Sequence, residues 1–258
     1  MKFLYIFPHP DDESFGPAAV MHSQLKKGHQ VYLLTLTKGG ATRERHKLGL
    51  SVAEMGEVRH KEMLAVEEVL GLSGMTVLDF PDSGLKEMDP RILELAVRKH
   101  IETLRPDVVV THPVHGISGF HDHIVTHAVV KRVYLKLGDT GASGDAAGVL
   151  GAAASRDAGL GFPRRLAFVT LPDSGKPTWT EDGSARLKLT EEALIDCVVR
   201  LENDDIQAMK NALACYATYK DTIDKVGVVE KIGDRVYFEL FGEDFTPPLS
   251  ELTERLRG

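Results

Sequence analysis

The stretch KFLYIFPHPDDE, residues 2–13, runs from a mostly apolar segment directly into prolines, a histidine and three acidic residues. A short apolar run that ends at a proline predicts a buried strand at Lys2–Phe7. Helical spacing follows at Phe15–Lys27 and stops at Gly28, and Gln30–Thr37 is a second strand-like run. This strand–helix–strand order is typical of a parallel sheet.

The same alternation continues along the chain. It predicts helices at Val52–Leu70, Pro90–Leu104, Asp122–Leu137 and Asp204–Lys220, strands at Thr76–Phe80, Val108–Thr111, Arg165–Leu171 and Ala193–Leu201, and hairpin strands at Val226–Ile232 and Arg235–Phe241. We therefore expect one α/β domain over residues 1–258. It would be a Rossmann-like, mostly parallel sheet with helices on both faces and a C-terminal β-hairpin extension at 226–241.

Residues 138–163 are rich in Gly, Ala, Asp and Ser and show no clear period. A connection of this length is usually functional or flexible. It is either a mobile flap near the site or an inert linker.

Composition narrows the class of partner. The 258 residues carry 31 Lys and Arg against 38 Asp and Glu, a formal charge of −7, which argues against a nucleic-acid partner. No apolar run approaches the roughly 18 residues of a membrane span, and the N-terminal run is shorter than the roughly 7–15 residues of a signal peptide. We expect a cytoplasmic protein without a membrane partner; homo-oligomerisation stays open.

The run His9-Pro10-Asp11-Asp12-Glu13 leaves the first strand. Several ionisable groups this close together cannot be buried cheaply without a cation or protons. Imidazole and carboxylate together suit a divalent metal such as zinc. The alternative is an acidic N-cap on the helix that follows.

A second cluster lies after the predicted strand Val108–Thr111. Five of the 11 histidines fall within 16 positions: His112, His115, His121, His123 and His127. On a helix that begins near residue 122, the last two share a face, whereas His121 and His123 do not. Ligands of parallel sheets bind at the carboxyl ends of the strands, so this cluster, Asp82 and the His9 loop are expected on one rim.

These motifs resemble the LmbE-like, or PIG-L-like, N-acetylglucosamine deacetylases. The family signature pairs a His-Pro-Asp-Asp-Glu run after the first strand with a later His-x-Asp-His run. The chain has the first in full at 9–13, and the second reads Gly-Phe-His-Asp-His at 119–123. Three further features complete the resemblance over roughly the first 130 residues, namely Arg59 with Glu62, the Arg-Pro-Asp run at 105–107, and Asp82 followed by Gly84.

The resemblance implies a zinc-dependent hydrolase that removes an N-acyl group from a small N-acetylglucosamine-type sugar. It implies Zn²⁺, or another divalent metal, held by His9, Asp12 and His123, with Asp11 as the general base that activates water. Arg59 and Asp82 would bind hydroxyls of the sugar-like substrate. From the residues alone, Arg59 with Glu62 could instead be a surface ion pair and Asp82 a turn residue.

Two departures from the family pattern matter. Phe120 stands where the family usually has the first His of its second motif, a residue thought to stabilise the oxyanion or supply a proton while the Asp tunes it. His121 is the candidate to take over, with Asp122 as its catalytic partner; alternatively, His121 could itself be a metal ligand. Tyr216 is a looser candidate for contacting substrate.

Rival functions follow from these departures. One is a metal- or sugar-binding relative with little turnover. Another is a metal-dependent enzyme that cleaves a non-sugar amide, an ester or a phosphoester. A phosphoesterase is less favoured because only Lys38, Arg43 and Arg45 are candidate cations near the rim.

Overall fold

A seven-stranded sheet crosses the part of the chain that the computed structural model describes, residues 1–139, 163–173 and 187–256. The strand order is β3-β2-β1-β4-β5-β7-β6. The strands are β1 (Lys2–Phe7), β2 (Gln30–Thr37), β3 (Gly74–Phe80), β4 (Val108–Thr111), β5 (Arg165–Thr170), β6 (Cys197–Arg200) and β7 (Arg235–Leu240). Strands β1 to β5 pair in parallel, whereas β7 is antiparallel to β5 and β6. The predicted mostly parallel α/β fold is confirmed.

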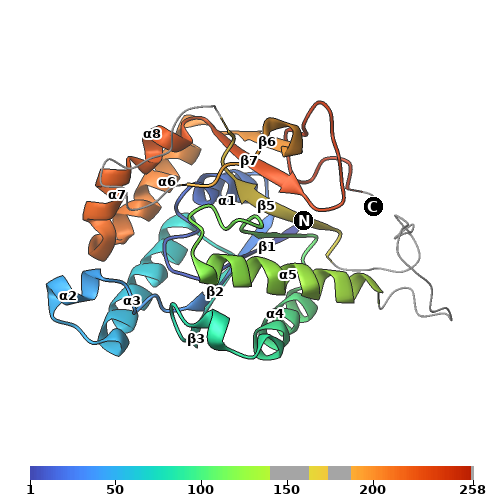
Figure 1. Cartoon of the computed structure of the whole chain (residues 1–258). Helices are drawn as coiled ribbons and strands as arrows, with labels where there is room; N and C mark the ends of the chain where they lie inside the picture. Colours follow the sequence, from blue (N-terminus) through green and yellow to red (C-terminus); the bar gives the residue numbers. More distant parts are fainter. Residues whose placement is uncertain (140–162, 174–186, 257–258) are drawn as a thin grey trace.

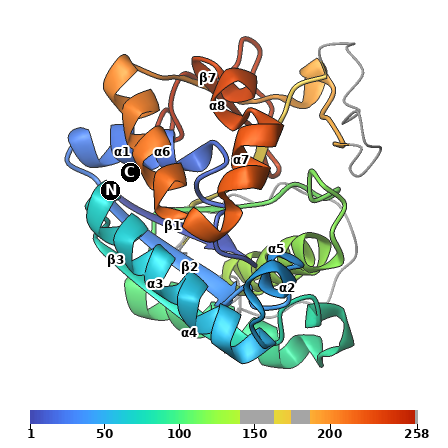
Figure 2. The same cartoon turned by 90° about the vertical axis from the view of Figure 1, so that its left-hand side faces the viewer.

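Helices cover both faces of the sheet (Figure 1). One face packs against α1 (Pro17–Lys26), α3 (Val52–Leu70) and α6 (Asn203–Cys215), and the other against α4 (Pro90–Leu104) and α5 (His121–Asp139). Figure 2 shows α7 (Lys220–Val226) and α8 (Val228–Ile232) beside α6, away from α4 and α5. A short helix, α2 (Glu44–Leu48), and three 3-10 turns, η1 (Leu85–Glu87), η2 (Glu192–Leu194) and η3 (Ala217–Tyr219), complete the described elements.

The central strand β1 divides its side chains between two cores. Phe3, Tyr5 and Phe7 belong to the core under α1, α3 and α6, and Leu4 and Ile6 belong to the core under α4 and α5. This alternation is the period of two that a strand buried on both faces requires. The strand therefore holds its carboxyl end rigidly between two packed layers.

The predicted C-terminal hairpin is wrong. Val228–Ile232 is helix α8, and only Arg235–Leu240 is a strand, which lies between β5 and β6. Gly227 takes a left-handed conformation that ends α7 and begins α8. The apolar residues of this short segment pack into the core beside α6 rather than pairing with β7. A brief apolar run does not by its period alone separate a strand from a helix.

Two other predicted elements are shorter than expected. Within Ala193–Leu201, only Cys197–Arg200 forms a strand, preceded by η2. The helix predicted at Asp204–Lys220 ends at Cys215, because the chain turns at Tyr216 and continues through η3 into α7. The loop predicted at 138–163 lies almost wholly outside the described residues, since 140–162 are not among them.

Within the described residues, no helix combines the length and the apolar character that crossing a membrane requires.

Helix α3, which carries Arg59 and Glu62, begins with a capping box. The Ser51 hydroxyl accepts a hydrogen bond from the Glu54 backbone N–H at 3.2 Å, and the Glu54 carboxylate accepts one from the Ser51 N–H at 2.9 Å. These bonds satisfy donors that a helix start leaves open.

We expect Ser51→Ala to lower the free energy of unfolding by about 1 kcal/mol, because it removes this cap. Glu68→Ala, at an exposed position of the same helix, is the matched control and should change it by less than about 0.5 kcal/mol. Urea denaturation followed by circular dichroism measures both. Equal effects would show that the cap does not hold the helix.

Candidate metal centre

Three side chains from two loops meet beyond the carboxyl ends of β1 and β4. His9 and Asp12 follow β1, and His123 lies in the first turn of α5. His9 Nδ1 is 3.2 Å from His123 Nε2 and 3.6 Å from Asp12 Oδ2, and His123 Nε2 is 3.3 Å from Asp12 Oδ1. Potential ligand atoms of the three residues all lie within 4.8 Å of one another. These are the three residues that the resemblance implied as metal ligands, so one candidate centre contains all of them.

The orientation of His123 leaves one nitrogen free for a cation. Its Nδ1 lies 3.0 Å from the Gly116 carbonyl oxygen, which can only accept, so Nδ1 carries the proton and Nε2 presents a lone pair to Asp12. Burial lowers the pKa of His123 to about 3, so the ring is neutral at neutral pH. A neutral imidazole fixed in this way is the form that binds metals.

His112 stacks on the His123 ring at a centroid distance of 4.0 Å and an interplanar angle of 6°. It is buried, and its two ring nitrogens have no hydrogen-bond partner among the described residues; Nε2 lies 3.5 Å from Asp12 Oδ1. Orphaned imidazole nitrogens and buried carboxylates beside one another fit a site that holds a cation or water.

The second nitrogen of His9 faces two more carboxylates. His9 Nε2 lies 3.2 Å from Asp82 Oδ1 and 3.3 Å from Asp122 Oδ2. Burial lowers the pKa of His9, but its bonds to Asp12, Asp122 and Asp82 outweigh this and raise it well above its usual range. Loops after β1, β3 and β4 therefore converge on one imidazole, which confirms the predicted common rim.

Asp11 and Arg59 form a buried pair beside the ligands. Arg59 Nη2 donates to Asp11 Oδ2 at 2.6 Å and to the Pro10 carbonyl oxygen at 2.9 Å. Asp11 has a left-handed backbone, with φ at 83°, which turns its side chain away from that of Asp12. Burial raises the pKa of Asp11 to about 6, against the opposing effect of Arg59. Its other oxygen, Oδ1, has no hydrogen-bond partner within the described part of the chain.

Arg59 is 2% exposed, which contradicts the surface-ion-pair alternative. Its guanidinium lies over the Tyr219 ring at 4.6 Å and packs closely against Gly39, where an added Cβ would lie 2.7 Å from Arg59 Nη1. Glu62 instead accepts hydrogen bonds from the backbone N–H and hydroxyl of Thr218, at 2.8 and 2.7 Å. The two residues thus make separate buried contacts, and substrate contact by Arg59 stays a prediction.

Tyr216 lies behind the first loop. Its side chain is fully buried, and its hydroxyl donates to Glu13 Oε1 at 2.6 Å. The Ser14 hydroxyl donates to the same oxygen at 2.6 Å. Burial raises the pKa of Glu13 to about 7. This geometry gives no support to the predicted substrate contact of Tyr216, which stays untested, and favours a role in holding the 9–13 loop.

The other histidines of the cluster at 112–127 lie in different environments, and His121 and His123 point to different sides of α5, as helical spacing predicts. His121 is exposed, whereas His123 is buried among the ligands. His127 bonds the His112 carbonyl oxygen at 3.0 Å and packs on Phe168. His115 lies 3.2 Å from the Thr190 hydroxyl. The predicted catalytic role of His121 therefore has no supporting contact among the described residues and stays a prediction.

His112 lies on the predicted rim as a member of the histidine cluster, because it directly follows β4. Other groups of the centre were not predicted. The carbonyl of Gly116, the aromatic cover of Tyr219 and the N–H of Ala41, which donates to Asp82 Oδ2 at 2.6 Å, had no signal in the sequence. Backbone groups and residues brought in by distant loops leave no local pattern.

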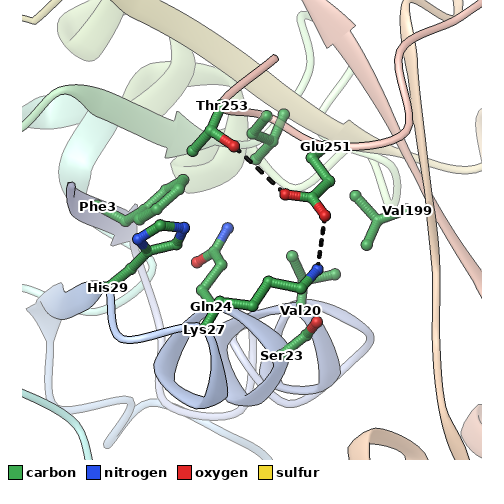
Figure 3. A pocket seen from close by; sticks show the side chains of 10 residues that line it. Phe3, Val20, Ser23, Gln24, Lys27, His29, Val199, Glu251 and Thr253 are labelled. Carbon is green, nitrogen blue, oxygen red and sulfur yellow. Dashed lines mark hydrogen bonds and ion pairs between the residues drawn. The ribbon is translucent and has the colours of Figure 1, made fainter.

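Two cavities lie away from the metal centre. Figure 3 shows one of about 20 Å³ near the start of β1, lined by Phe3 and the Lys27–Glu251 ion pair, which measures 2.8 Å. A second, of about 460 Å³, lies beside β5 and β7 and is lined by His127 and Phe168. Neither is lined by the three ligands, so chemistry is assigned to the centre from its side chains rather than from cavity size.

Known proteins match the half of the chain that builds this centre. The sequence model of the PIG-L family, described as GlcNAc-PI de-N-acetylase, matches residues 4–134. The chain belongs to this family. PIG-L-type motifs thus account for the loops after β1, β3 and β4, and the expected recognition is confirmed.

Two curated relatives and one solved structure illustrate the likeness. A mycothiol S-conjugate amidase from Streptomyces coelicolor is 33% identical over 54% of this chain and 54% of its own length. A 1D-myo-inositol 2-acetamido-2-deoxy-alpha-D-glucopyranoside deacetylase from Kineococcus radiotolerans is 33% identical over 54% of this chain and 46% of its own. The chain therefore spans about half the length of these PIG-L relatives.

The structural likeness extends further along the chain. The crystal structure of a 4-carboxy-2-hydroxymuconate hydratase from Pseudomonas putida superposes with a TM-score of 0.66, covering 97% of this chain and 100% of its own at 13% identity. At this identity the likeness establishes the fold alone. Because a fold hosts different chemistries, function has to be argued from the site.

We expect Tyr216→Phe to lower the free energy of unfolding by about 1–3 kcal/mol, because it removes a donor to a buried carboxylate. Tyr219→Phe, which loses only a 3.3 Å bond from Thr42, is the control and should cost about 0.5 kcal/mol or less. Denaturant unfolding measures both. If Tyr216→Phe were as stable as the parent but bound substrate more weakly, the substrate-contact interpretation would be correct.

Proposed function

We propose that the chain is a zinc-dependent hydrolase that removes an N-acyl group, an acetyl group in the simplest case, from a small N-acetylglucosamine-type sugar or glycoconjugate. The observation that carries this proposal is the meeting of His9, Asp12 and His123 beside Asp11, whose free oxygen faces no protein partner among the described residues. The printed names of the relatives, an acetamido-sugar deacetylase and an amidase, support amide cleavage.

The spacing of the ligand atoms suits zinc. Zinc binds nitrogen and oxygen at about 2.0–2.2 Å in tetrahedral sites, which separates neighbouring ligand atoms by roughly 3.3 Å. His123 Nε2 lies 3.2 Å from His9 Nδ1 and 3.3 Å from Asp12 Oδ1, and His9 Nδ1 lies 3.6 Å from the other Asp12 oxygen, Oδ2. Two imidazoles and one carboxylate are one of the three-ligand sets found in catalytic zinc sites, and three protein ligands leave one position open.

Bound zinc would act as a Lewis acid that polarises the acyl carbonyl and lowers the pKa of water from 15.7 toward about 7. Asp11 Oδ1 takes the proton as the water oxygen attacks the acyl carbon. When the carbon–nitrogen bond breaks, Asp11 returns this proton to the departing amine, so that a carboxylic acid and an amine leave. Arg59 holds the opposite oxygen of Asp11 and fixes the direction of Oδ1.

Asp82 is the residue best placed to contact a sugar hydroxyl. It lies at the end of β3 on the common rim, with Oδ2 already bonded to the Ala41 N–H and Oδ1 beside His9. A carboxylate held on one side by a backbone donor is a directed acceptor for hydroxyl groups. Arg59 and Tyr216, both buried, are assigned here to positioning rather than to direct substrate contact.

One observation favours a second candidate, a metal- or sugar-binding relative with little turnover. Phe120 replaces the family's usual His, its ring is 66% exposed, and its centroid lies 5.8 Å from that of His123. A phenyl ring supplies neither a proton nor an oxyanion donor. Stoichiometric zinc without turnover of any N-acyl sugar would favour this candidate.

We expect Asp11→Asn to keep zinc nearly stoichiometric while reducing amine release from N-acetylglucosamine-type substrates by at least about 100-fold, because it removes a general base. Asp12→Asn should lose zinc, because it removes a ligand. Metal content by mass spectrometry and fluorescamine detection of amine separate the two variants. Full activity of Asp11→Asn would show that another group is the base.

Removal of the metal offers an independent check. Dialysis against a chelator should abolish amine release, and one equivalent of zinc should restore it. Activity that survives full metal depletion would contradict the zinc-dependent proposal.

The role of His121 is tested by His121→Ala. If it replaces the missing family histidine, the turnover number should fall by roughly 100-fold with zinc content unchanged. Because the His121 side chain is exposed and has no contact with the centre among the described residues, we expect the turnover number to fall by less than about fivefold. Steady-state kinetics with His60→Ala as a matched histidine control on α3 decide between the two results.

A further inference from the structure

One nitrogen of His9 faces more acceptors than it can satisfy. Nε2 carries at most one hydrogen, yet Asp82 Oδ1 and Asp122 Oδ2 lie at nearly equal distances, 3.2 and 3.3 Å. A metal ligand of this kind usually donates its second N–H to a carboxylate, which fixes the ring and its tautomer. Here Asp82 and Asp122 could each accept the hydrogen bond from His9 Nε2–H. The other hydrogen bonds of the two carboxylates indicate which one does so.

Asp122 is bound on all sides by the protein. It is 2% exposed, and it accepts hydrogen bonds from the backbone N–H groups of Ser83 at 2.8 Å and Leu85 at 3.2 Å. Its own N-terminal position on α5 adds a favourable helix end for negative charge. It stands next to the ligand His123, so it links the β3 loop, α5 and His9 in one fixed arrangement.

Asp82 is held less completely. Only Oδ2 has a backbone donor, the Ala41 N–H at 2.6 Å, and its side chain is 9% exposed against 2% for Asp122. Oδ1 has no backbone donor among the described residues; its partners are His9 Nε2 at 3.2 Å and the Ser83 hydroxyl at 3.5 Å. It is therefore the less firmly held oxygen of Asp82, and the one that can exchange a partner for a hydroxyl.

We propose that the two carboxylates divide the work: Asp122 is the positioning residue that holds the His9 Nε2–H and so directs the Nδ1 lone pair at the metal, whereas Asp82 Oδ1 exchanges His9 for a substrate hydroxyl. The first half rests on the ligand geometry alone. The second half rests on the proposed function. Asp122 thereby acts on a metal ligand, not on His121 as the sequence resemblance implied.

The amide variant exposes this division. In Asp122→Asn the two carboxylate oxygens, Oδ2 facing the Ser83 N–H and His9 and Oδ1 facing the Leu85 N–H, become one oxygen and one NH₂ group. In one orientation the NH₂ group faces the His9 Nε2–H, and in the other a neutral oxygen shared with the Ser83 N–H is all that Nε2–H has. In both orientations His9 loses its charged acceptor, so its ring is held less firmly and Nδ1 becomes a weaker metal ligand. Asp82→Asn suffers no such loss at His9, because Asp122 still accepts the Nε2 proton.

The test compares Asp122→Asn with Asp82→Asn. Both are isosteric substitutions, and both residues contact the same nitrogen, His9 Nε2. Zinc dissociation constants are measured by competition with a chromophoric chelator. We expect roughly 10–100-fold weaker zinc binding for Asp122→Asn and less than about threefold for Asp82→Asn. With zinc saturating, Asp82→Asn should raise KM for an N-acetylated sugar by about tenfold or more, while Asp122→Asn should leave KM within about threefold.

Equal zinc affinities of the two variants, or a larger loss for Asp82→Asn, would overturn the proposal. The melting temperature of each metal-free variant checks folding. If Asp122→Asn melts much lower, Asp122→Glu keeps the carboxylate and should bind zinc at least about fivefold more tightly than the amide; equal affinity of these two would also overturn it. Because zinc binding needs no turnover, an inactive protein would contradict the proposed function without touching the role of Asp122.

Discussion

The parallel pairing of β1 with β4 is the constraint on which the rest of the structure depends. Tyr5 aligns with Val110, so both strands end at the same edge, and the rings of His9 and His112, which follow them, both lie near the ring of His123. The strand order runs from β1 to β2 and β3 on one side and to β4 and β5 on the other, so the topological switch point lies between β1 and β4. Ligands of parallel α/β sheets usually bind at this point. Burial of β1 on both faces keeps the edge rigid, and a rigid edge is what lets short side chains share one ion.

The meeting of His9, Asp12 and His123 was predictable because each of these residues lies close to the end of a regular element. A strand that ends in His-Pro-Asp-Asp, and a helix that starts in His-Asp-His, leave little freedom in where the side chains go. The same logic predicted that His121 and His123 would not share a helix face, and in the structure His121 is exposed and His123 is buried. The sheet and most helices followed from apolar period alone, since strands β1 to β5 and helices α3 and α4 occur where the pattern placed them.

Other features depended on residues far apart in the chain. The contact of Arg59 with Asp11 depends on Pro10, Gly39 and Tyr219, which only the folded chain brings together around the guanidinium. The hairpin failed for a similar reason, because Val228 could bury itself equally well from a strand or a helix and packing beside α6 decided the outcome. Local pattern limits the choices in such segments, and tertiary contact selects among them.

The residues after 134 lie outside the family match. They nevertheless make hydrogen bonds to the 9–13 loop and to α3. Tyr216 bonds Glu13, the residue directly after Asp12, and Thr218 bonds Glu62, one helical turn from Arg59. The end of the family match at residue 134 therefore does not separate two independent parts of the structure. Substitutions in this C-terminal buttress would therefore shift the 9–13 loop from behind, and so change the geometry of the centre while His9, Asp12 and His123 stay the same.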